Sequence, residues 1–600
     1  MACRIEDYAV LGDLGTAALV GIDGSVDWLC LPRFDSPACF AALLGTPDHG
    51  RWLLAPDGQY AVARRYLPDS FVLETTYTTA EGVVQVLDAM PAADGRADVV
   101  RQVNGLRGSV RMRHEWVVRF GYGKVRPWVH RIVDHHGNPA LHAVAGPDML
   151  VLRGSRLPTA NEGRHEDLFD IGAGEQLHWS TTWFASWQQV PHPLEVPVCL
   201  DDTARDWRRW AAMAEHDGPY HEPLVRSLLV LRVLTHAETG GIVAAVTTSL
   251  PEEFGGSRNW DYRYCWLRDA ALTLHSLVTA GFRDEAQAWQ WWLLRAVAGD
   301  PEDIQIMYGV DGGRELPERE LTHLPGYEGS LPVRVGNAAV DQRQTDVLGE
   351  VMMALEAARD AGLDGDGMAW ALQRVLVDEL ARHWDQPDNG IWEIRGQPQH
   401  FTHSRVMVWA AFDRAVRAVE QYGLAGPVED WRRLRDTVHA EVLKKGYDEQ
   451  LGSFVQYYGA KHTDAALLQI PISGFLPYDD PRVVGTVRAI ERELGHDGLL
   501  LRYRTDVGVD GLPPGEHPFL ACSFWLAQVH ACSGRLEQAA TLLDRLCALG
   551  GPLGLLAEEY DPLAQRMAGN YPQALSHLAL VAAVLAYRRA SPRSPEPGES

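Results

Sequence analysis

The chain has 600 residues, of which 46% are hydrophobic and 22% charged, a balance typical of a folded globular protein with at least two domains. Its 55 Lys and Arg residues against 80 Asp and Glu residues give a net charge of −25. Such a surface repels nucleic-acid phosphates and anionic lipids. This argues against nucleic-acid and membrane-surface binding and leaves a small neutral ligand, such as a sugar, compatible.

The eight cysteines are scattered, with no C-x-x-C pair and no zinc-ligand spacing, so no metal site is predicted. Scattered cysteines in a large chain are typical of reduced thiols in the cytosol. Residues 1–10 contain no apolar core of a signal peptide, and no run is long enough to span a bilayer. We therefore expect a cytoplasmic protein.

Residues 1–200 show short runs rich in β-branched and aromatic residues. Residues 71–77 and 83–87, with a turn between them, predict a β-hairpin. Residues 109–120 and 177–187 also predict strands. Several such runs separated by Gly and Pro predict an N-terminal antiparallel β-sandwich.

Residues 201–222 predict a connector, which contains a linking helix at 205–210. Beyond it, residues 223–590 show the helical period. Roughly a dozen helices with long loops between them suit antiparallel pairs closed into a ring. The Pro- and Ser-rich residues 591–600 are expected to be disordered. The predicted helices include 265–280, 284–298, 340–362, 366–386, 404–421, 427–445, 481–494, 519–534, 536–549 and 572–590.

The chain has no G-x-G-x-x-G, P-loop, G-x-S-x-G or H-E-x-x-H motif, which argues against the common nucleotide-binding, serine-hydrolase and zinc-protease classes. Instead, five loop segments near predicted helix ends are dense in Trp, Tyr, Asp, Glu, Arg and Gly. Arg and carboxylate side chains hold hydroxyl groups by charge-assisted hydrogen bonds, and glycosidic cleavage needs one protonated and one ionised carboxyl group. For any one segment, the alternative is that its residues cap helices or pack in the core. That alternative explains less well why five such segments occur on a single ring of helices. The segments are 259–269, 308–312, 325–330, 389–396 and 556–562.

These segments resemble the signature loops of glycoside hydrolase family 15, which contains glucoamylases, glucodextranases and bacterial and archaeal trehalases. The resemblance covers nearly the whole chain and rests on NWDYRYCWLRDA, GIWEIRG and LAEEYDP, with HFTHSRVMVWAAFDRA and GNYPQALSHLAL as further matches. Residues 5–40 resemble the β-sandwich that precedes the barrel in the trehalase-like branch. The family implies an (α/α)6 barrel over residues of about 220–590.

The resemblance implies catalytic roles for two glutamates. Glu393 follows Trp392 as the general acid, and Glu558 matches the general base, with Glu559 as the alternative base. The Arg268–Asp269 pair would grip the non-reducing glucose. In an inverting enzyme the two carboxyl groups are roughly 6.5–9.5 Å apart.

The predicted acid must be protonated, so burial beside Trp392 should raise the pKa of Glu393. The base must be ionised, and Tyr308 or Ser576 are candidate donors to it. The product from an α-linkage would be β-glucose.

The remaining predicted substrate-binding residues are Trp260, Tyr308, Trp392, Arg405, Glu559 and His577. A structural role within a helix is the alternative for His403 and His577, and Trp409 and Trp525 favour the core. Asp346 and Asp464 could position hydroxyls or serve as caps. From the first domain, Asp27 and Trp28 could reach the site.

Fungal glucoamylases have a second Glu after the acid, where this chain has Ile394. This departure and the trehalase-like first domain favour α,α-trehalase. A glucoamylase or α-1,4/1,6-glucosidase acting on maltose, isomaltose or dextrins is the alternative. A catalytically inactive carbohydrate-binding protein and a phosphorylase or lyase on the same ring are further alternatives.

No cofactor is predicted from the residues themselves. The resemblance implies phosphate and magnesium for some trehalases of the family, and no motif decides whether this chain needs them. No clear signal of self-association is present, so no oligomeric state is predicted.

Overall fold

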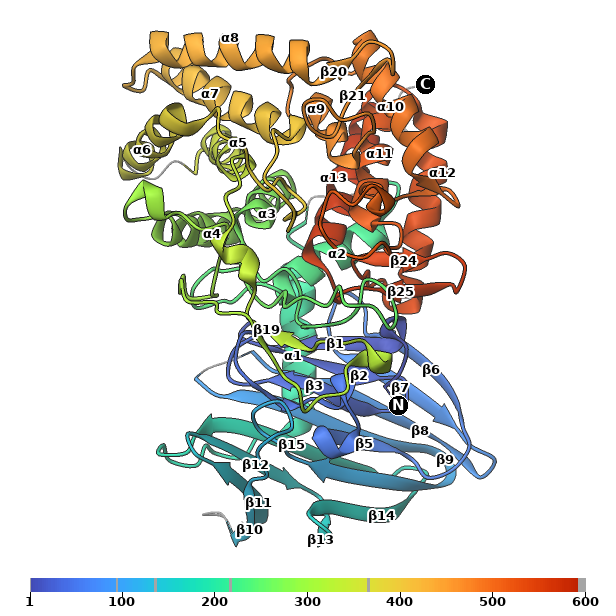
Figure 1. The fold of residues 1–600 in the computed structure, drawn as a ribbon. Helices are drawn as coiled ribbons and strands as arrows, with labels where there is room; N and C mark the ends of the chain where they lie inside the picture. The colour runs from blue at the N-terminus through green and yellow to red at the C-terminus, as the bar shows by residue number, and fades with distance from the viewer. Residues whose placement is uncertain (1, 93–94, 134–136, 215–217, 364–366, 592–600) are drawn as a thin grey trace, which may run out of the picture.

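The computed structural model describes residues 2–92, 95–133, 137–214, 218–363 and 367–591. An antiparallel β-sandwich is followed by a ring of helices, as predicted (Figure 1). The predicted disorder of residues 592–600 lies outside the described residues. All eight cysteines are free. Among the described helices, none is long and apolar enough to cross a bilayer.

The sandwich is built from two antiparallel sheets that share the long strand β9. The first half of β9 pairs with β8 and β15, and its second half pairs with β5 and β14. Glycine is required where β9 passes between the sheets, because a Cβ on Gly105 would lie 2.0 Å from the carbonyl oxygen of Gly172. The predicted hairpin is confirmed as β7 and β8. The strands are β1 (Tyr8–Gly12), β2 (Ala17–Gly21), β3 (Ser25–Cys30), β4 (Ala38–Phe40), β5 (Arg51–Pro56), β6 (Ala61–Tyr66), β7 (Leu73–Thr78), β8 (Gly82–Ala89), β9 (Ala97–Val117), β10 (Trp128–Val133), β11 (Pro139–Ala145), β12 (Asp148–Gly154), β13 (Thr159–Asn161), β14 (Arg164–Gly172) and β15 (Gln176–Ala185).

The helices of the ring alternate between an inner and an outer layer. In the inner layer α3, α5, α7, α9, α11 and α13 contact one another in turn, and α13 returns to α3. Composition explains the layers: α11 is apolar on all sides and buried, whereas α8 buries only Trp431, Val438 and Val442. The helices are α1 (Val196–Ala211), α2 (His221–Val233), α3 (Leu267–Thr279), α4 (Arg283–Ala296), α5 (Asp346–Asp360), α6 (Gly367–His383), α7 (Thr402–Tyr422), α8 (Val428–Lys445), α9 (Gln469–Ile472), α10 (Pro481–Leu494), α11 (Leu520–Cys532), α12 (Leu536–Leu549) and α13 (Ala574–Ala590).

Two helix predictions differ from the structure. The helix predicted at 340–362 begins only at Asp346, because Asn337 accepts a hydrogen bond from the backbone of Ala339 and caps a separate 3-10 turn. The inner helix α9 was not predicted, since four residues are too few to show a helical period.

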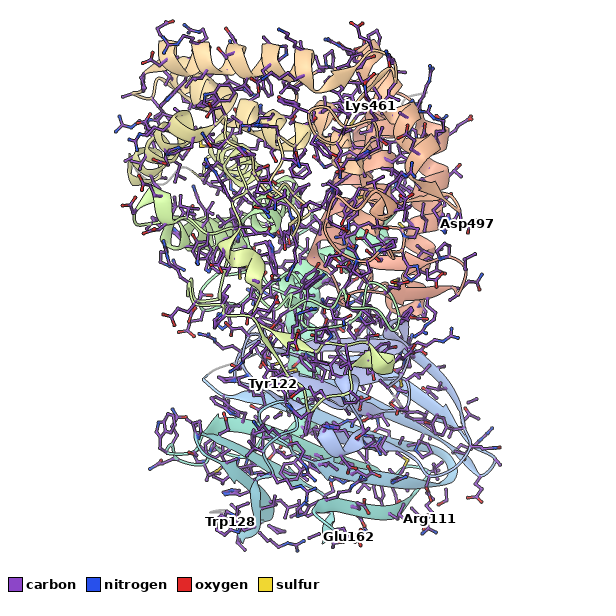
Figure 2. All side chains as sticks on the ribbon, viewed as in Figure 1. Arg111, Tyr122, Trp128, Glu162, Lys461 and Asp497 are labelled. Atoms are coloured by element: carbon purple, nitrogen blue, oxygen red, sulfur yellow. The ribbon has the colours of Figure 1, made fainter. Side chains whose placement is uncertain are left out.

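The sandwich packs against the loops at one end of the ring. One continuous cluster of buried hydrophobic side chains runs through both parts. Trp28 of β3 donates from Nε1 to the carbonyl oxygen of Val246 at 2.8 Å, and Tyr571 donates to the carbonyl oxygen of Tyr8 at 2.8 Å. Figure 2 shows Tyr122 at this boundary and Trp128 at the far side of the sandwich. The sandwich therefore supports loops of the ring directly.

Candidate active site

A cavity lies at the end of the ring that faces the sandwich. Its lining includes residues at or just before the first turn of α3, α11 and α13, and it encloses about 700 Å³ of empty volume including its mouth. Three of the five predicted segments line it: 259–269, 389–396 and 556–562. The segments 308–312 and 325–330 contribute no lining residue.

Glu393 lies in the loop before α7, and its backbone is in the left-handed region with φ of 57°. Trp266 donates from Nε1 to Oε1 of Glu393 at 2.6 Å, and Nη1 of Arg268 lies 4.0 Å from the same oxygen. Burial raises the pKa of Glu393, and the positive charge of Arg268 opposes this shift. The direction agrees with the expectation for a proton donor.

Glu558 lies in the loop before β24 (Glu559–Asp561) and is 1% exposed. Tyr262 donates to its Oε1 at 2.7 Å, and its Oε2 makes no hydrogen bond with the described residues. Gly569 leaves room for this carboxyl group, because a Cβ there would lie 2.6 Å from Oε2. Burial, with the nearby Glu252 carboxylate, raises the pKa of Glu558 to about 8, and Arg502 opposes the shift.

One short segment holds both glutamates. Tyr262 contacts Glu558 and Trp266 contacts Glu393, and the two rings meet edge to face with centroids 5.4 Å apart. The two carboxyl groups are therefore held on either side of an aromatic pair that lines the same cavity. The predicted separation of 6.5–9.5 Å remains a prediction.

The proposed donors to Glu558 were wrong. Tyr308 accepts a hydrogen bond from the backbone of Gln305, and Ser576 donates to the carbonyl oxygen of Ala557. Neither side chain contacts Glu558, whose donor is Tyr262.

Arg268 and Asp269 line the cavity together, as predicted. Nε of Arg268 donates to Oδ1 of Asp269 at 2.8 Å, and Nη1 donates to the carbonyl oxygen of Ile391 at 2.7 Å. The second bond ties the Arg–Asp pair to the loop of Glu393. The two segments thus form one wall of the cavity.

Trp260 and Trp392 also line the cavity. Trp392 donates from Nε1 to Asp464 at 2.8 Å. The guanidinium groups of Arg395 and Arg334 lie 4.0 and 4.6 Å from the ring centroid of Trp260. Cations thus lie against the ring of Trp260, which was predicted to bind substrate.

Tyr308 and Glu559 lie outside the cavity, contrary to the prediction. Tyr308 is buried in β17 (Met307–Tyr308), where it pairs with Cys265. Glu559 accepts a hydrogen bond on Oε2 from the backbone of His517. Of the two neighbours, Glu558 is therefore the one that lines the cavity.

Arg405 and His577 lie outside the cavity as well. Arg405 donates to the carbonyl oxygen of Gln386. The ring of His577 accepts from the backbone of Leu556 at 3.1 Å, and burial lowers its pKa to about 3. A neutral His577 thus supports the loop of the predicted base from behind.

The less favoured candidates also lie away from the lining. Asp27 is bonded to Tyr8 and Ser25 inside the sandwich. His403, Trp409, Trp525, Asp346 and Asp464, with Trp28, are buried and do not line the cavity.

The sequence did not predict a charged wall beside Glu558. Arg502 bonds to Glu252 at 2.8 Å and to Glu516 at 2.5 Å, and Arg258 bonds to Asp510 at 2.6 Å. Glu252, Arg258, Arg502 and Asp510 line the cavity. The available signal was the cluster of Arg, Tyr and Asp within the long loop between α10 and α11.

Two family models match the chain. The model for glycosyl hydrolases family 15 matches residues 218–585, and the trehalase-like N-terminal model matches residues 1–167. The trehalase of Mycolicibacterium smegmatis is 37% identical, over 99% of this chain and 92% of its own. The trehalase of Thermoplasma acidophilum is 35% identical, over 94% and 97%.

A solved structure of a bacterial glucoamylase complexed with acarbose has the same fold. Its TM-score is 0.72 at 12% identity, and the match covers 98% of this chain and 95% of that one. Fold, cavity and relatives define a glycoside hydrolase. Within that class, the chain belongs to glycosyl hydrolases family 15.

Proposed function

We propose that this enzyme hydrolyses α,α-trehalose by inversion, with Glu393 as general acid and Glu558 as general base. The observation that carries the roles is the Tyr262–Trp266 pair, which holds one carboxyl group on each side. The two relatives aligned over nearly their full length, both named trehalase, support the substrate.

In this mechanism, Glu393 gives its proton to the glycosidic oxygen as the bond to the anomeric carbon breaks. Glu558 removes a proton from a water molecule that attacks the same carbon from the opposite face. Burial of Glu393 helps it to keep a proton until the leaving oxygen needs it. Trehalose would yield one β-glucose and one α-glucose.

Arg268 and Asp269 would bind hydroxyl groups of the glucose whose anomeric carbon is attacked. Their mutual hydrogen bond fixes the direction of both side chains. The bond from Arg268 to the carbonyl oxygen of Ile391 holds the glucose site in register with Glu393. These two residues therefore position the substrate relative to its proton donor.

The test is hydrolysis of trehalose, maltose, isomaltose and starch, followed by proton NMR. We expect trehalose to be cleaved fastest, and β-glucose to appear first from maltose if maltose is cleaved. Preference for maltose or starch would replace trehalase by the glucoamylase alternative. α-Glucose appearing first from maltose would exclude inversion, and no hydrolysis at all would favour the carbohydrate-binding alternative.

The matched variant is Glu393→Gln, which should lower kcat by about 10²–10⁴-fold while leaving the unfolding transition unchanged. Near-normal turnover by this variant would contradict the role of Glu393.

A requirement for phosphate and magnesium remains a prediction. Magnesium prefers carboxylate and carbonyl oxygens, but no cluster of three or more His, Cys, Asp or Glu within the described residues could hold a metal ion. The arginines of the charged wall already bond to carboxylates. For localisation we propose the cytoplasm, which the free cysteines support.

A further inference from the structure

A second cavity lies inside the ring, on the opposite side from the active site. It runs from the middle of the inner helices to the C-terminal ends of α5, α11 and α13. It encloses about 1200 Å³ of empty volume including its mouth. We call it the rear cavity.

The walls of the rear cavity are mostly apolar. They include Leu272, Met353, Ile472, Trp525 and Leu578, from five of the inner helices. Trp525 also packs against Trp392 with ring centroids 5.9 Å apart, and Trp392 lines the active site. This pair of rings therefore lies between the two cavities.

Glu350 is one of the charged residues in this wall. It lies one turn after Asp346 on α5, lines the rear cavity and is 4% exposed. Burial raises the pKa of its carboxyl group, the charges of Asp346 and Asp269 add to this and that of Arg268 opposes it, and among the described residues none forms a hydrogen bond with it. A buried carboxyl group without a partner is costly.

The other acidic groups of the rear cavity have partners. Glu356 pairs with Arg414 at 3.2 Å and with Arg417 at 3.1 Å. Asp360, at the mouth, accepts a hydrogen bond from Tyr422. Glu350 is thus the carboxyl group of this cavity whose bonding capacity is unused by the described protein.

We propose that the rear cavity binds a small organic cation, with the ammonium group on Glu350 and the carbon chain against the apolar wall. Once ionised, the Glu350 carboxylate selects a cation, and a buried charge pair needs hydrogen bonds that an ammonium group can give. The surrounding Leu, Met, Ile and Trp side chains select a ligand with an apolar body. The site is separate from the proposed hydrolysis and does not depend on it.

Butylammonium chloride is the probe, and isothermal titration calorimetry measures its binding to the full chain at pH 9. Burial raises the pKa of Glu350 to about 8, so its carboxylate is populated at pH 9, and an alkylammonium, like lysine, keeps its proton there. The other charged or titratable groups near Glu350 or lining the rear cavity are Arg268, Asp269, Asp346, Glu356, Asp360, Arg414, Tyr478, Cys532 and Arg589.

Wild type should bind one equivalent, and Glu350→Gln should weaken binding at least about tenfold. Asp360→Asn, on the same helix and in the same cavity, is the matched control and should bind as wild type. Glu350→Met is a second test, since Met has similar length and suits an apolar wall. It should also lose binding.

Glycosidase carboxylates in the active site could attract the same cation, so Glu393→Gln and Glu558→Gln are titrated in parallel. Both should bind the probe as wild type. Loss of binding in either variant with retention in Glu350→Gln would move the site to the active-site cavity and overturn the proposal. Absence of binding to wild type would overturn it as well.

Discussion

Glu393 and Glu558 share a direction of pKa shift but differ in their neighbours. Glu558 is buried and the Glu393 side chain is partly buried at 21% exposure, and in both cases the loss of water favours the protonated carboxyl group. Glu393 is opposed by the cationic Arg268, whereas Glu558 has the like charge of Glu252 nearby. In the proposed mechanism the productive form has the proton on Glu393 and none on Glu558. The pH profile of kcat/KM should therefore be bell-shaped, and its two apparent pKa values belong to the interacting pair and not to either residue alone.

Removing the Tyr262 hydroxyl tests how the base is tuned. Its hydrogen bond favours the ionised form of Glu558, so Tyr262→Phe should raise the pKa of Glu558 further. The pH optimum of kcat/KM depends on both pKa values and should therefore move to higher pH, whichever of the two is larger. Tyr264→Phe, in the same segment, is the control, and an unmoved optimum in Tyr262→Phe would contradict this coupling.

The two adjacent glutamates at 558 and 559 offer a matched pair. Glu558→Gln should lower kcat by about 10²–10⁴-fold, because the amide cannot accept the proton of water. Glu559→Gln keeps an oxygen that can accept from the backbone of His517, and it should retain most activity. Steady-state kinetics of both variants decides which glutamate acts as the base. A larger loss of kcat in Glu559→Gln than in Glu558→Gln would make Glu559 the base.

Arg263 links the segment 259–269 to the sandwich. Its guanidinium group donates two hydrogen bonds to the carboxylate of Asp261. It also donates to Tyr122 at 2.9 Å and to the carbonyl oxygen of Ser36 at 2.9 Å. Tyr262 is the next residue in the chain and holds Glu558. We therefore regard Arg263 as a positioning residue, which acts on the base from the sandwich side.

Arg263→Lys keeps the charge but cannot form the two parallel hydrogen bonds to Asp261. The buried groups left without partners should lower the free energy of unfolding by about 1–3 kcal/mol. The pH optimum should also move, because Tyr262 loses its fixed position. Chemical denaturation and the pH profile measure these effects. The control is Arg65→Lys, which alters an exposed ion pair with Glu74 in the sandwich. A change in stability without a change in the pH profile would leave Arg263 only a structural role.

For the loops and helices, the sequence predicted well which segments come together. It predicted less well which of their side chains point into the cavity. The signature loops bring Arg268, Glu393 and Glu558 to one cavity. Tyr308 was misplaced because its strand pairing with Cys265 depends on a residue more than forty positions away, which no local period reveals. Arg405 and His577 lie on helices whose inward faces bury structural hydrogen bonds as readily as ligand contacts.

The two parts of the molecule share one hydrophobic cluster, which crosses from the sandwich to the ring. Units joined by a core of this kind unfold together. Differential scanning calorimetry should therefore show one transition for the full chain. Two resolved transitions would mean that the interface is weaker than its packing suggests.

Glu350 gives the whole molecule a pH-dependent stability. Between its ordinary pKa of 4.5 and its folded value of about 8, the folded protein holds a proton that the unfolded chain releases. The free energy of unfolding from this group therefore falls as pH rises through that window. Glu350→Gln does not titrate, so it should gain stability over wild type from pH 5 to pH 8, by on the order of a few kcal/mol. Melting temperatures of wild type and Glu350→Gln at pH 5 and pH 8 test this. The same difference in melting temperature at both pH values would contradict it.

The left-handed backbone at Glu393 bears on attempts to engineer this enzyme. A non-glycine residue at φ of 57° costs about 1–2 kcal/mol, and glycine would relieve it. A library screened only for heat resistance would therefore enrich glycine at the position of the proposed proton donor. Any thermostabilised version must be selected with turnover as a second criterion, or position 393 must be left out of the library.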